Sequence, residues 1–217
     1  MDTVAYILVG CLALVVIIFV VWQLASRRFS LPCPVWLRWM VELDNPFTRT
    51  NRAAAIIEHL DPRPGMAVLD LGCGPGRLAI PLAGRVGHDG RVVAVDLQAG
   101  MLDRVRHKAK AAGAENIELL HAGAGEGKLE RGRFDRALLV TVLGEIPDRL
   151  AALKEVFEAL KPGGLLVVTE VIFDPHFQRR STIRRLATEA GFRLRAIHGN
   201  RIAYTMVLER HSSATAG

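Results

Sequence analysis

Hydrophobic residues along the chain follow two patterns. One long uncharged run extends from Val4 to Leu24, and short apolar runs alternate with amphipathic stretches beyond about residue 50. Short, near-continuous apolar runs are typical of buried strands, and apolar residues every three or four positions are typical of helices. The pattern therefore predicts an N-terminal membrane-spanning helix followed by one domain of alternating strands and helices.

The alternation beyond residue 50 predicts seven strands. They are expected at residues 68–71, 91–96, 117–121, 134–142, 165–170, 192–198 and 202–209, with helices at 52–60, 77–86, 99–112, 149–160 and 182–190. Apolar strands separated by helices predict an α/β fold, a mostly parallel sheet with helices on both faces. Only Gly199-Asn200-Arg201 separates the last two strands, so they are expected to form a terminal antiparallel pair.

The uncharged run is long enough to cross a bilayer. About 20 apolar residues at 1.5 Å each cover the roughly 30 Å of a hydrocarbon core. Only Asp2 precedes the run as a charge, which disfavours a cleaved signal peptide. Arg27 and Arg28 follow it, so the positive-inside rule predicts a single-pass membrane protein, with the bilayer contacted through residues 4–24 and a cytoplasmic C-terminal domain.

These features predict four regions. They are a membrane anchor with a basic flank over 1–28, a juxtamembrane segment over 29–50, the α/β domain over 51–210 and a flexible tail over 211–217. Trp36 and Trp39 are spaced with Met40 and Leu43 on one helix face, which either lies on the membrane or caps the domain core.

Charge and cysteine content narrow the classes of partner. The net charge is +6, and seven arginines lie between His176 and Arg201, against one acid, Glu189. Such a run is either a solvated helix face or a surface that meets anionic lipid. No base-reading motif accompanies it, so no nucleic-acid partner is expected. The cysteines at 11, 33 and 73 lack metal-ligand spacing, so no metal site is expected.

The most informative stretch is Val68-Leu69-Asp70-Leu71-Gly72-Cys73-Gly74-Pro75-Gly76. A strand ends in an acid, three alternate glycines turn the chain, and a helix begins. Glycines at such a turn let the backbone approach a ligand closely. A dinucleotide fingerprint needs G-x-G-x-x-G, but the third glycine comes one residue early and Arg77 stands where that pattern has glycine.

The stretch resembles motif I, D-x-G-x-G-x-G, of class I S-adenosylmethionine (SAM)-dependent methyltransferases of the type 11, or UbiE-like, group. Lys161-Pro162-Gly163-Gly164 before an apolar strand resembles a second signature of that family. The resemblance covers residues about 45–210. It implies a Rossmann-like, seven-stranded domain that binds SAM.

The resemblance also implies which residues bind the cofactor. In this family an acid that ends the second strand bonds the ribose hydroxyls, here Asp96, and an apolar residue such as Met101 packs against adenine. The full set of expected cofactor-binding residues is Asp70, Gly72, Cys73, Gly74, Gly76, Asp96, Leu97, Met101, Gly123, Ala124 and Thr141. One position departs from the pattern: the acid expected after the third strand is replaced by Ala122-Gly123-Ala124-Gly125, with Glu126 nearest.

Catalytic residues are not readable from the motifs alone. Methyl transfer needs a general base only when the acceptor must lose a proton. Candidates at the carboxyl ends of the fourth and fifth strands are His176, Glu170 and Glu145, with Thr141 and Asp174 beside them. Tyr204 and Asn200 are further residues expected near the cleft.

The predicted function is methyl transfer from SAM to a small, lipid-like or membrane-associated acceptor. A phospholipid headgroup and a quinone precursor are examples of such an acceptor. Two alternatives remain at this stage: an NAD-dependent oxidoreductase, and a SAM-binding membrane scaffold without turnover. The sequence leaves the acceptor atom and the oligomeric state open.

Overall fold

The computed structural model describes residues 3–29 and 51–211. The segment 30–50, with Trp36 and Trp39, and the tail from 212 lie outside the described residues. The helices are α1 (Thr3–Phe29), α3 (Ala53–Leu60), α4 (Ala79–Val86), α5 (Ala99–Ala112), α6 (Arg149–Ala159) and α7 (Arg180–Glu189). The strands are β1 (Ala67–Leu71), β2 (Arg91–Asp96), β3 (Ile117–His121), β4 (Phe134–Val140), β5 (Leu160–Val171), β6 (Phe192–Gly199) and β7 (Ala203–Arg210).

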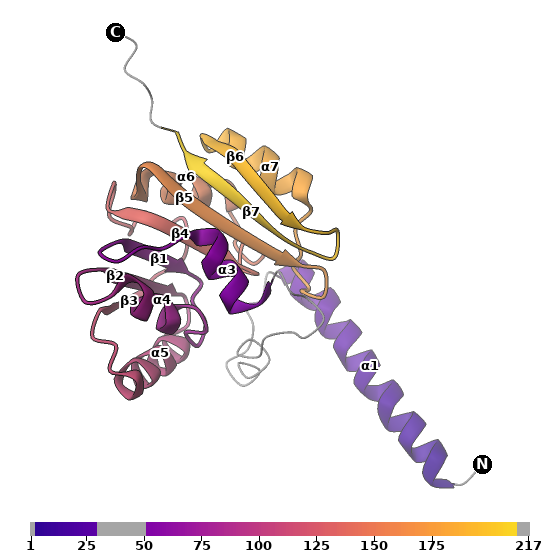
Figure 1. The fold of residues 1–217 in the computed structure, drawn as a ribbon. Coiled ribbons are helices and arrows are strands. Elements are labelled where there is room, and N and C mark those ends of the chain that lie inside the picture. Colours follow the sequence, from indigo (N-terminus) through magenta and orange to yellow (C-terminus); the bar gives the residue numbers. More distant parts are fainter. Residues whose placement is uncertain (1–2, 30–50, 212–217) are drawn as a thin grey trace.

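The strands form one seven-stranded sheet in the order β3-β2-β1-β4-β5-β7-β6 (Figure 1). β1 pairs in parallel with β2 and β4, β2 with β3, and β4 with β5. β7 lies between β5 and β6 and is antiparallel to both. The predicted mixed α/β fold with a closing antiparallel pair is confirmed, and the carboxyl ends of the five parallel strands share one edge.

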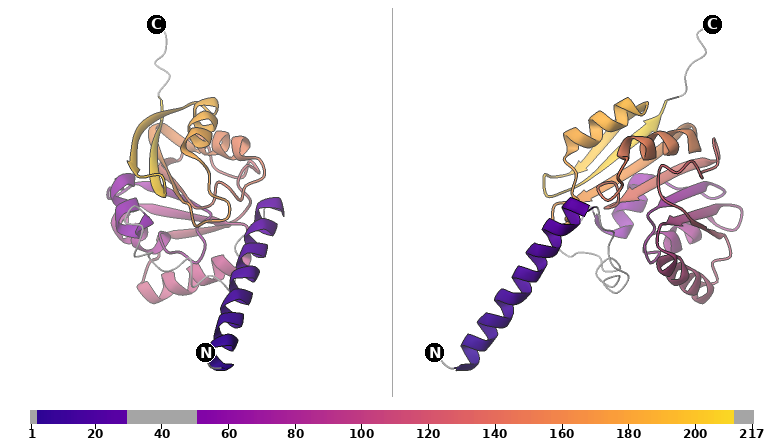
Figure 2. Two further views of the ribbon diagram at one scale, coloured as in Figure 1. Left: turned by 90° about the vertical axis from the view of Figure 1, so that its right-hand side faces the viewer. Right: turned by 180° about the vertical axis from the view of Figure 1, so that it is seen from behind.

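Helices cover both faces of the sheet (Figure 2). Ile56 and Leu60 of α3 pack with Leu82 of α4 and Val105 of α5 in one buried cluster. Residues of α6 and α7 pack on the opposite face in a second cluster. Because both faces are covered, polar side chains that serve a ligand have to gather at strand ends rather than on the sheet.

The fifth strand differs from its predicted bounds. It begins at Leu160 and passes through the Lys-Pro-Gly-Gly stretch that was expected to be a turn. Leu160 pairs with Phe134, and the register then shifts before Arg136 pairs with Leu165. The stretch is therefore an irregularity inside a strand, where Gly163 takes a positive φ of 77°.

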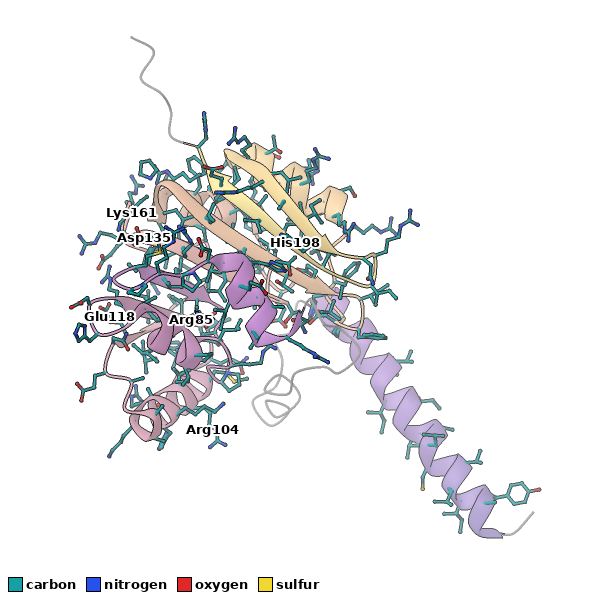
Figure 3. All side chains as sticks on the ribbon, viewed as in Figure 1. Arg85, Arg104, Glu118, Asp135, Lys161 and His198 are labelled. Atoms are coloured by element: carbon teal, nitrogen blue, oxygen red, sulfur yellow. The ribbon has the colours of Figure 1, made fainter. Side chains whose placement is uncertain are left out.

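Polar contacts fasten the amino ends of the central strands. Asp135 of β4 accepts hydrogen bonds from the Ala67 backbone N–H at 2.9 Å and from Lys161 Nζ at 2.7 Å. Asp135 and Lys161 lie close together in Figure 3. The contacts connect β1, β4 and β5, so the register at the opposite, carboxyl ends is fixed as well.

The structure corrects the membrane prediction. Within the part of the chain that the structure describes, no helix has both the length and the apolar content needed to span a bilayer. The predicted single-pass location, with an anchor through residues 4–24 and a cytoplasmic catalytic domain, is therefore wrong. The prediction rested on the length and apolar content of one run of sequence, and no described helix meets both requirements for a span.

Asn116, just before β3, provides a stability test. Its Nδ2 donates to the carbonyl oxygens of Ala83 at 3.0 Å and Gly87 at 2.7 Å, at the end of α4. Asn116→Ala should lower the free energy of unfolding by about 1–2 kcal/mol, because these carbonyls lose their donor. Urea denaturation measures the change. His88→Ala, at an exposed side chain in the same turn, is the control and should leave stability unchanged.

Candidate functional site

The glycine turn follows β1 directly and begins the candidate site. Gly72, Gly74 and Gly76 have φ values of 74°, 51° and 83°, which residues with a Cβ rarely adopt. A Cβ on Gly72 would lie 2.5 Å from Cγ2 of Val142, in the loop after β4. Glycine is therefore required at Gly72 both by its φ and by the close approach of another loop.

Backbone hydrogen bonds attach this turn to β2. The N–H groups of Gly72 and Cys73 donate to Val95 O at 2.8 and 3.0 Å. Asp96, the last residue of β2, accepts from the Gly74 N–H at 2.9 Å through Oδ2 and from the Gln98 N–H at 2.8 Å through Oδ1. Each carboxylate oxygen retains a second lone pair, so Asp96 is oriented and can still accept from a bidentate donor such as a diol.

Asp70 lies buried beneath the turn, at the end of β1. Its Oδ2 has no hydrogen-bond partner among the described residues. Burial and the nearby Asp96 raise the pKa of Asp70 to about 7, against the opposing effects of Arg77 and the Ala79 N–H. Burial also raises the pKa of Asp96, and the Gln98 and Gly74 N–H groups oppose that shift. Two buried acids beside a glycine turn favour a ligand that carries positive charge or donates hydrogen bonds.

Cys73 and Arg77 have local structural contacts. Cys73 is buried, and burial raises the pKa of its thiol. A buried, protonated thiol is a poor nucleophile. Arg77, at the position that departs from the dinucleotide pattern, donates to Asn51 O at 2.9 Å and so ties the turn to the segment before α3.

The remaining predicted cofactor residues flank this turn. Leu97 is 59% exposed after β2, whereas Met101 of α5 is buried. In the loop after β3, Gly123 and Ala124 are half-buried. Glu126 is exposed and pairs with Lys128 at 2.8 Å. That hydrogen bond and the Gly123 N–H lower the pKa of Glu126, which is thus a charged surface residue.

Thr141 directly follows β4 and has an unusual backbone. Its φ is 55°, a rare conformation for a β-branched residue. Its N–H donates to Thr169 O at 2.9 Å, and its Oγ1 donates to Val140 O at 2.7 Å. Backbone strain of this kind is concentrated at functional sites. Here it turns the β4–α6 loop toward the glycine turn, where Val142 meets Gly72.

A second polar cluster lies at the ends of β4 and β5. Two predicted catalytic candidates lie together, since His176 Nδ1 is 3.7 Å from Glu145 Oε1, and Asp174 Oδ1 is 3.9 Å from the same nitrogen. Glu170 is 1% exposed, and its Oε2 accepts from the Gln178 N–H at 2.9 Å. Burial is the main cause that raises the pKa of Glu170 to about 8.

Sequence reasoning missed Arg149 and Gln178 as members of this cluster. Arg149 donates to the carbonyls of Leu143 and Gly144, and so holds the β4–α6 loop. An arginine at the first position of a helix opposes the helix dipole, which is a signal that could have identified it. Gln178 lies in an irregular loop and gives no such signal; its carbonyl accepts from Tyr204 Oη at 2.5 Å.

A separate hollow of about 720 Å³ lies at the other end of the sheet. It is lined at the starts of β2 and β3 by Arg91, Asn116 and Glu118, with small residues of α4 and α5 around them. It contains none of the predicted site residues. Among the described residues, no group of three or more His, Cys, Asp or Glu side chains is arranged to hold a metal.

Comparisons with known proteins agree with this geometry. A family model described as a methyltransferase domain matches residues 68–164. The demethylmenaquinone methyltransferase of Lactococcus lactis is 39% identical over 106 residues, 49% of this chain and 42% of that protein. The corresponding protein of Bacillus cereus strain AH187 is 37% identical over 111 residues, 51% of this chain and 47% of that protein. The chain spans less than half the length of these curated relatives.

Solved structures share the fold. A SAM-dependent methyltransferase from Aquifex aeolicus has a TM-score of 0.73 at 20% identity, over 82% of this chain and 99% of that one. A phosphoethanolamine methyltransferase from Haemonchus contortus in complex with S-adenosylhomocysteine has a TM-score of 0.61 at 21% identity, over 73% of this chain and 41% of that one. The predicted enzyme class and its cofactor, SAM, are confirmed at the level of the domain. Residues 68–164 therefore carry a SAM-dependent methyltransferase domain, within a fold that solved SAM-dependent methyltransferases share.

Proposed function

We propose that the chain transfers a methyl group from SAM to a small, quinone-like acceptor. The observation that supports this most directly is Asp96, whose carboxylate is fixed by two backbone N–H groups beside the glycine turn. The names of the curated relatives supply the acceptor class: they are demethylmenaquinone methyltransferases. The shared region is less than half of those proteins, so the acceptor is a proposal for this chain.

The donor side fits SAM in shape and charge. A ribose diol meets the remaining lone pairs of Asp96 as a bidentate donor. Asp70 Oδ2, which has no partner in the described part of the chain, lies beside the turn and favours the positive charge of SAM. We propose that Gly72, Gly74 and Gly76 let the backbone contact the ligand, with Cys73 as a small, buried neighbour. Leu97, Met101, Gly123, Ala124 and Thr141 complete the proposed cofactor site.

The acceptor side fits an uncharged molecule better than an anion. Glu145 and Asp174 lie within 3.9 Å of His176, the charges of both acids act on Glu170, and Arg149 donates to two loop carbonyls. A phosphate or carboxylate at this position would face several acids. A hydroxylated ring that can lose a proton avoids that repulsion.

The experiment that tests the proposal measures binding of the donor and methylation of the acceptor separately. Isothermal titration should show binding of SAM and none of NAD. Formation of S-adenosylhomocysteine should then depend on a reduced demethylated naphthoquinone, and mass spectrometry should find one added methyl group. SAM binding with turnover of phosphoethanolamine, but of no quinol, would contradict the proposed acceptor.

Replacement of Asp96 tests the donor site. Asp96→Asn should weaken SAM binding about 10- to 100-fold, because charge-assisted hydrogen bonds to the diol are lost. Calorimetry measures the dissociation constant. Asp89→Asn is the matched control, since Asp89 has a side chain that is 81% exposed in the turn before β2. Equal affinity in both variants would contradict the role of Asp96.

The raised pKa of Asp70 predicts two effects of pH. A carboxyl whose pKa rises from 3.8 unfolded to about 7 folded stabilises the fold below about pH 4, and this contribution is lost as the pH rises toward 7. Asp70→Asn should therefore flatten the decline in unfolding free energy between pH 4 and about 7. SAM, as a cation, should bind more tightly as Asp70 ionises, with proton release near pH 7. Calorimetry in buffers of different ionisation enthalpy measures that release, which Asp70→Asn should abolish.

A further inference from the structure

Glu170 has a buried carboxylate oxygen that accepts no hydrogen bond from the described residues. The residue is the last but one of β5, next to Val171, and is 1% exposed. Oε2 accepts the Gln178 N–H at 2.9 Å, whereas Oε1 has no hydrogen-bond partner among the described residues. An unpaired buried acceptor costs free energy, so native structures retain few of them, and each needs an explanation.

The surroundings of Glu170 suit proton exchange near neutral pH. Burial raises its pKa to about 8, and the charges of Asp174 and Glu145 raise it further, while the Gln178 N–H and Arg149 lower it. A general base acts most efficiently when its pKa is close to the working pH. A carboxyl in ordinary solvent, with a pKa near 4, would be a much weaker base.

In the strand order, one strand separates Glu170 from the glycine turn on the donor side. β4 lies between β1, which leads into the glycine turn, and β5, which carries Glu170. The loop after β4 touches both sides, because Val142 meets Gly72 and Gly144 packs against the backbone of His176. Neighbouring strands are about 4.8 Å apart, so an acceptor at the end of β4 would lie between the donor and Glu170.

We propose that Glu170 is the catalytic base that takes the acceptor's hydroxyl proton, an assignment that rests on the proposed methyl transfer to a quinol-like ring. As that proton moves to Glu170, the O–H electron pair flows into the ring, and a ring carbon forms a bond to the methyl carbon. The methyl–sulfur bond breaks with its electron pair left on sulfur. The ring carbon then loses its own hydrogen as a proton to solvent, and the ring oxygen takes back the proton held by Glu170 as the aromatic hydroxyl forms again. One proton is thus released per turnover, Glu170 is again ionised, and nothing is oxidised or reduced.

Hydrogen bonds from neighbouring groups position residues 173–178, the segment after β5 that contacts Glu170. Tyr204 Oη donates to Gln178 O, and the His176 N–H donates to Asp174 Oδ1 at 2.7 Å. Phe173, at the start of the same segment, is 60% exposed. Because Glu170 is 1% exposed and bonded to Gln178, we expect acceptor binding to displace part of residues 173–178 so that the proton can reach Oε1.

Glu170→Gln tests the assignment. Glutamine keeps an oxygen that can accept the Gln178 N–H, but it cannot take a proton. Methyl transfer should fall at least 100-fold, within the range of general-base contributions, while the dissociation constant of SAM changes less than twofold. The wild-type rate should rise with pH toward about 8, and this limb should vanish in the variant. Glu189→Gln, on α7 beside Arg185, is the matched control and should retain full activity.

An infrared titration of the wild-type protein gives a readout that needs no turnover. A neutral carboxyl band should disappear around pH 8 in the wild type and be missing in Glu170→Gln, whatever the acceptor is. The assignment is overturned if Glu170→Gln shows the same titrating carboxyl band as the wild type, or if the variant keeps a third or more of wild-type activity. Wild-type protein that shows the titration and binds SAM, but methylates no quinol, would instead contradict the proposed acceptor.

Discussion

The parallel pairing of β1 with β2 and β4 is the constraint on which the rest of the structure depends. It brings the carboxyl ends of these strands to one edge, while helices exclude water from both faces of the sheet. Asp70, Asp96 and Glu170 therefore lie at strand ends with little exposure. Their pKa values are raised chiefly by burial, which is the electrostatic cost of placing acids at this edge.

The acids on the two sides of this edge differ in how fully their oxygens are hydrogen-bonded. On the donor side, two backbone N–H groups satisfy Asp96, and the glycine turn supplies them without side chains in the way. On the acceptor side, Glu145 and Asp174 lie 3.7 and 3.9 Å from His176 Nδ1, and Glu170 accepts the Gln178 N–H through Oε2, while its Oε1 has no partner among the described residues. A well-satisfied acid suits binding, whereas an incompletely satisfied one suits proton transfer.

The loop after β4 couples the two sides physically. Its first residue, Thr141, is held at a positive φ, and its next residue packs against Gly72. Arg149 holds the loop from α6 through two carbonyls. In the proposed methyl transfer, a ligand that contacts the glycine turn would therefore also act on the loop after β4. Transfer between two bound molecules requires such fixed relative positions.

The sequence by itself determined the element order, the antiparallel closing pair and the donor motif. These features depend on local signals: apolar period, short connections and glycines in a turn after Asp70. It also identified Asp96 and Glu170 as candidate site residues, because the ends of strands can be predicted from the apolar runs. The membrane prediction was wrong, since hydropathy of a segment was taken as evidence for a spanning helix.

Only the tertiary structure decided how these acids behave. Three features depend on how separate elements pack: Val142 fills the space beside Gly72, Arg149 donates to loop carbonyls, and Glu170 Oε1 is left without a partner among the residues described. Even the Lys-Pro-Gly-Gly stretch became an irregular part of β5, because β4 pairs with both of its ends. Local sequence specifies which groups stand at a strand end, but burial and partners supplied by other elements set their pKa and hence their chemistry.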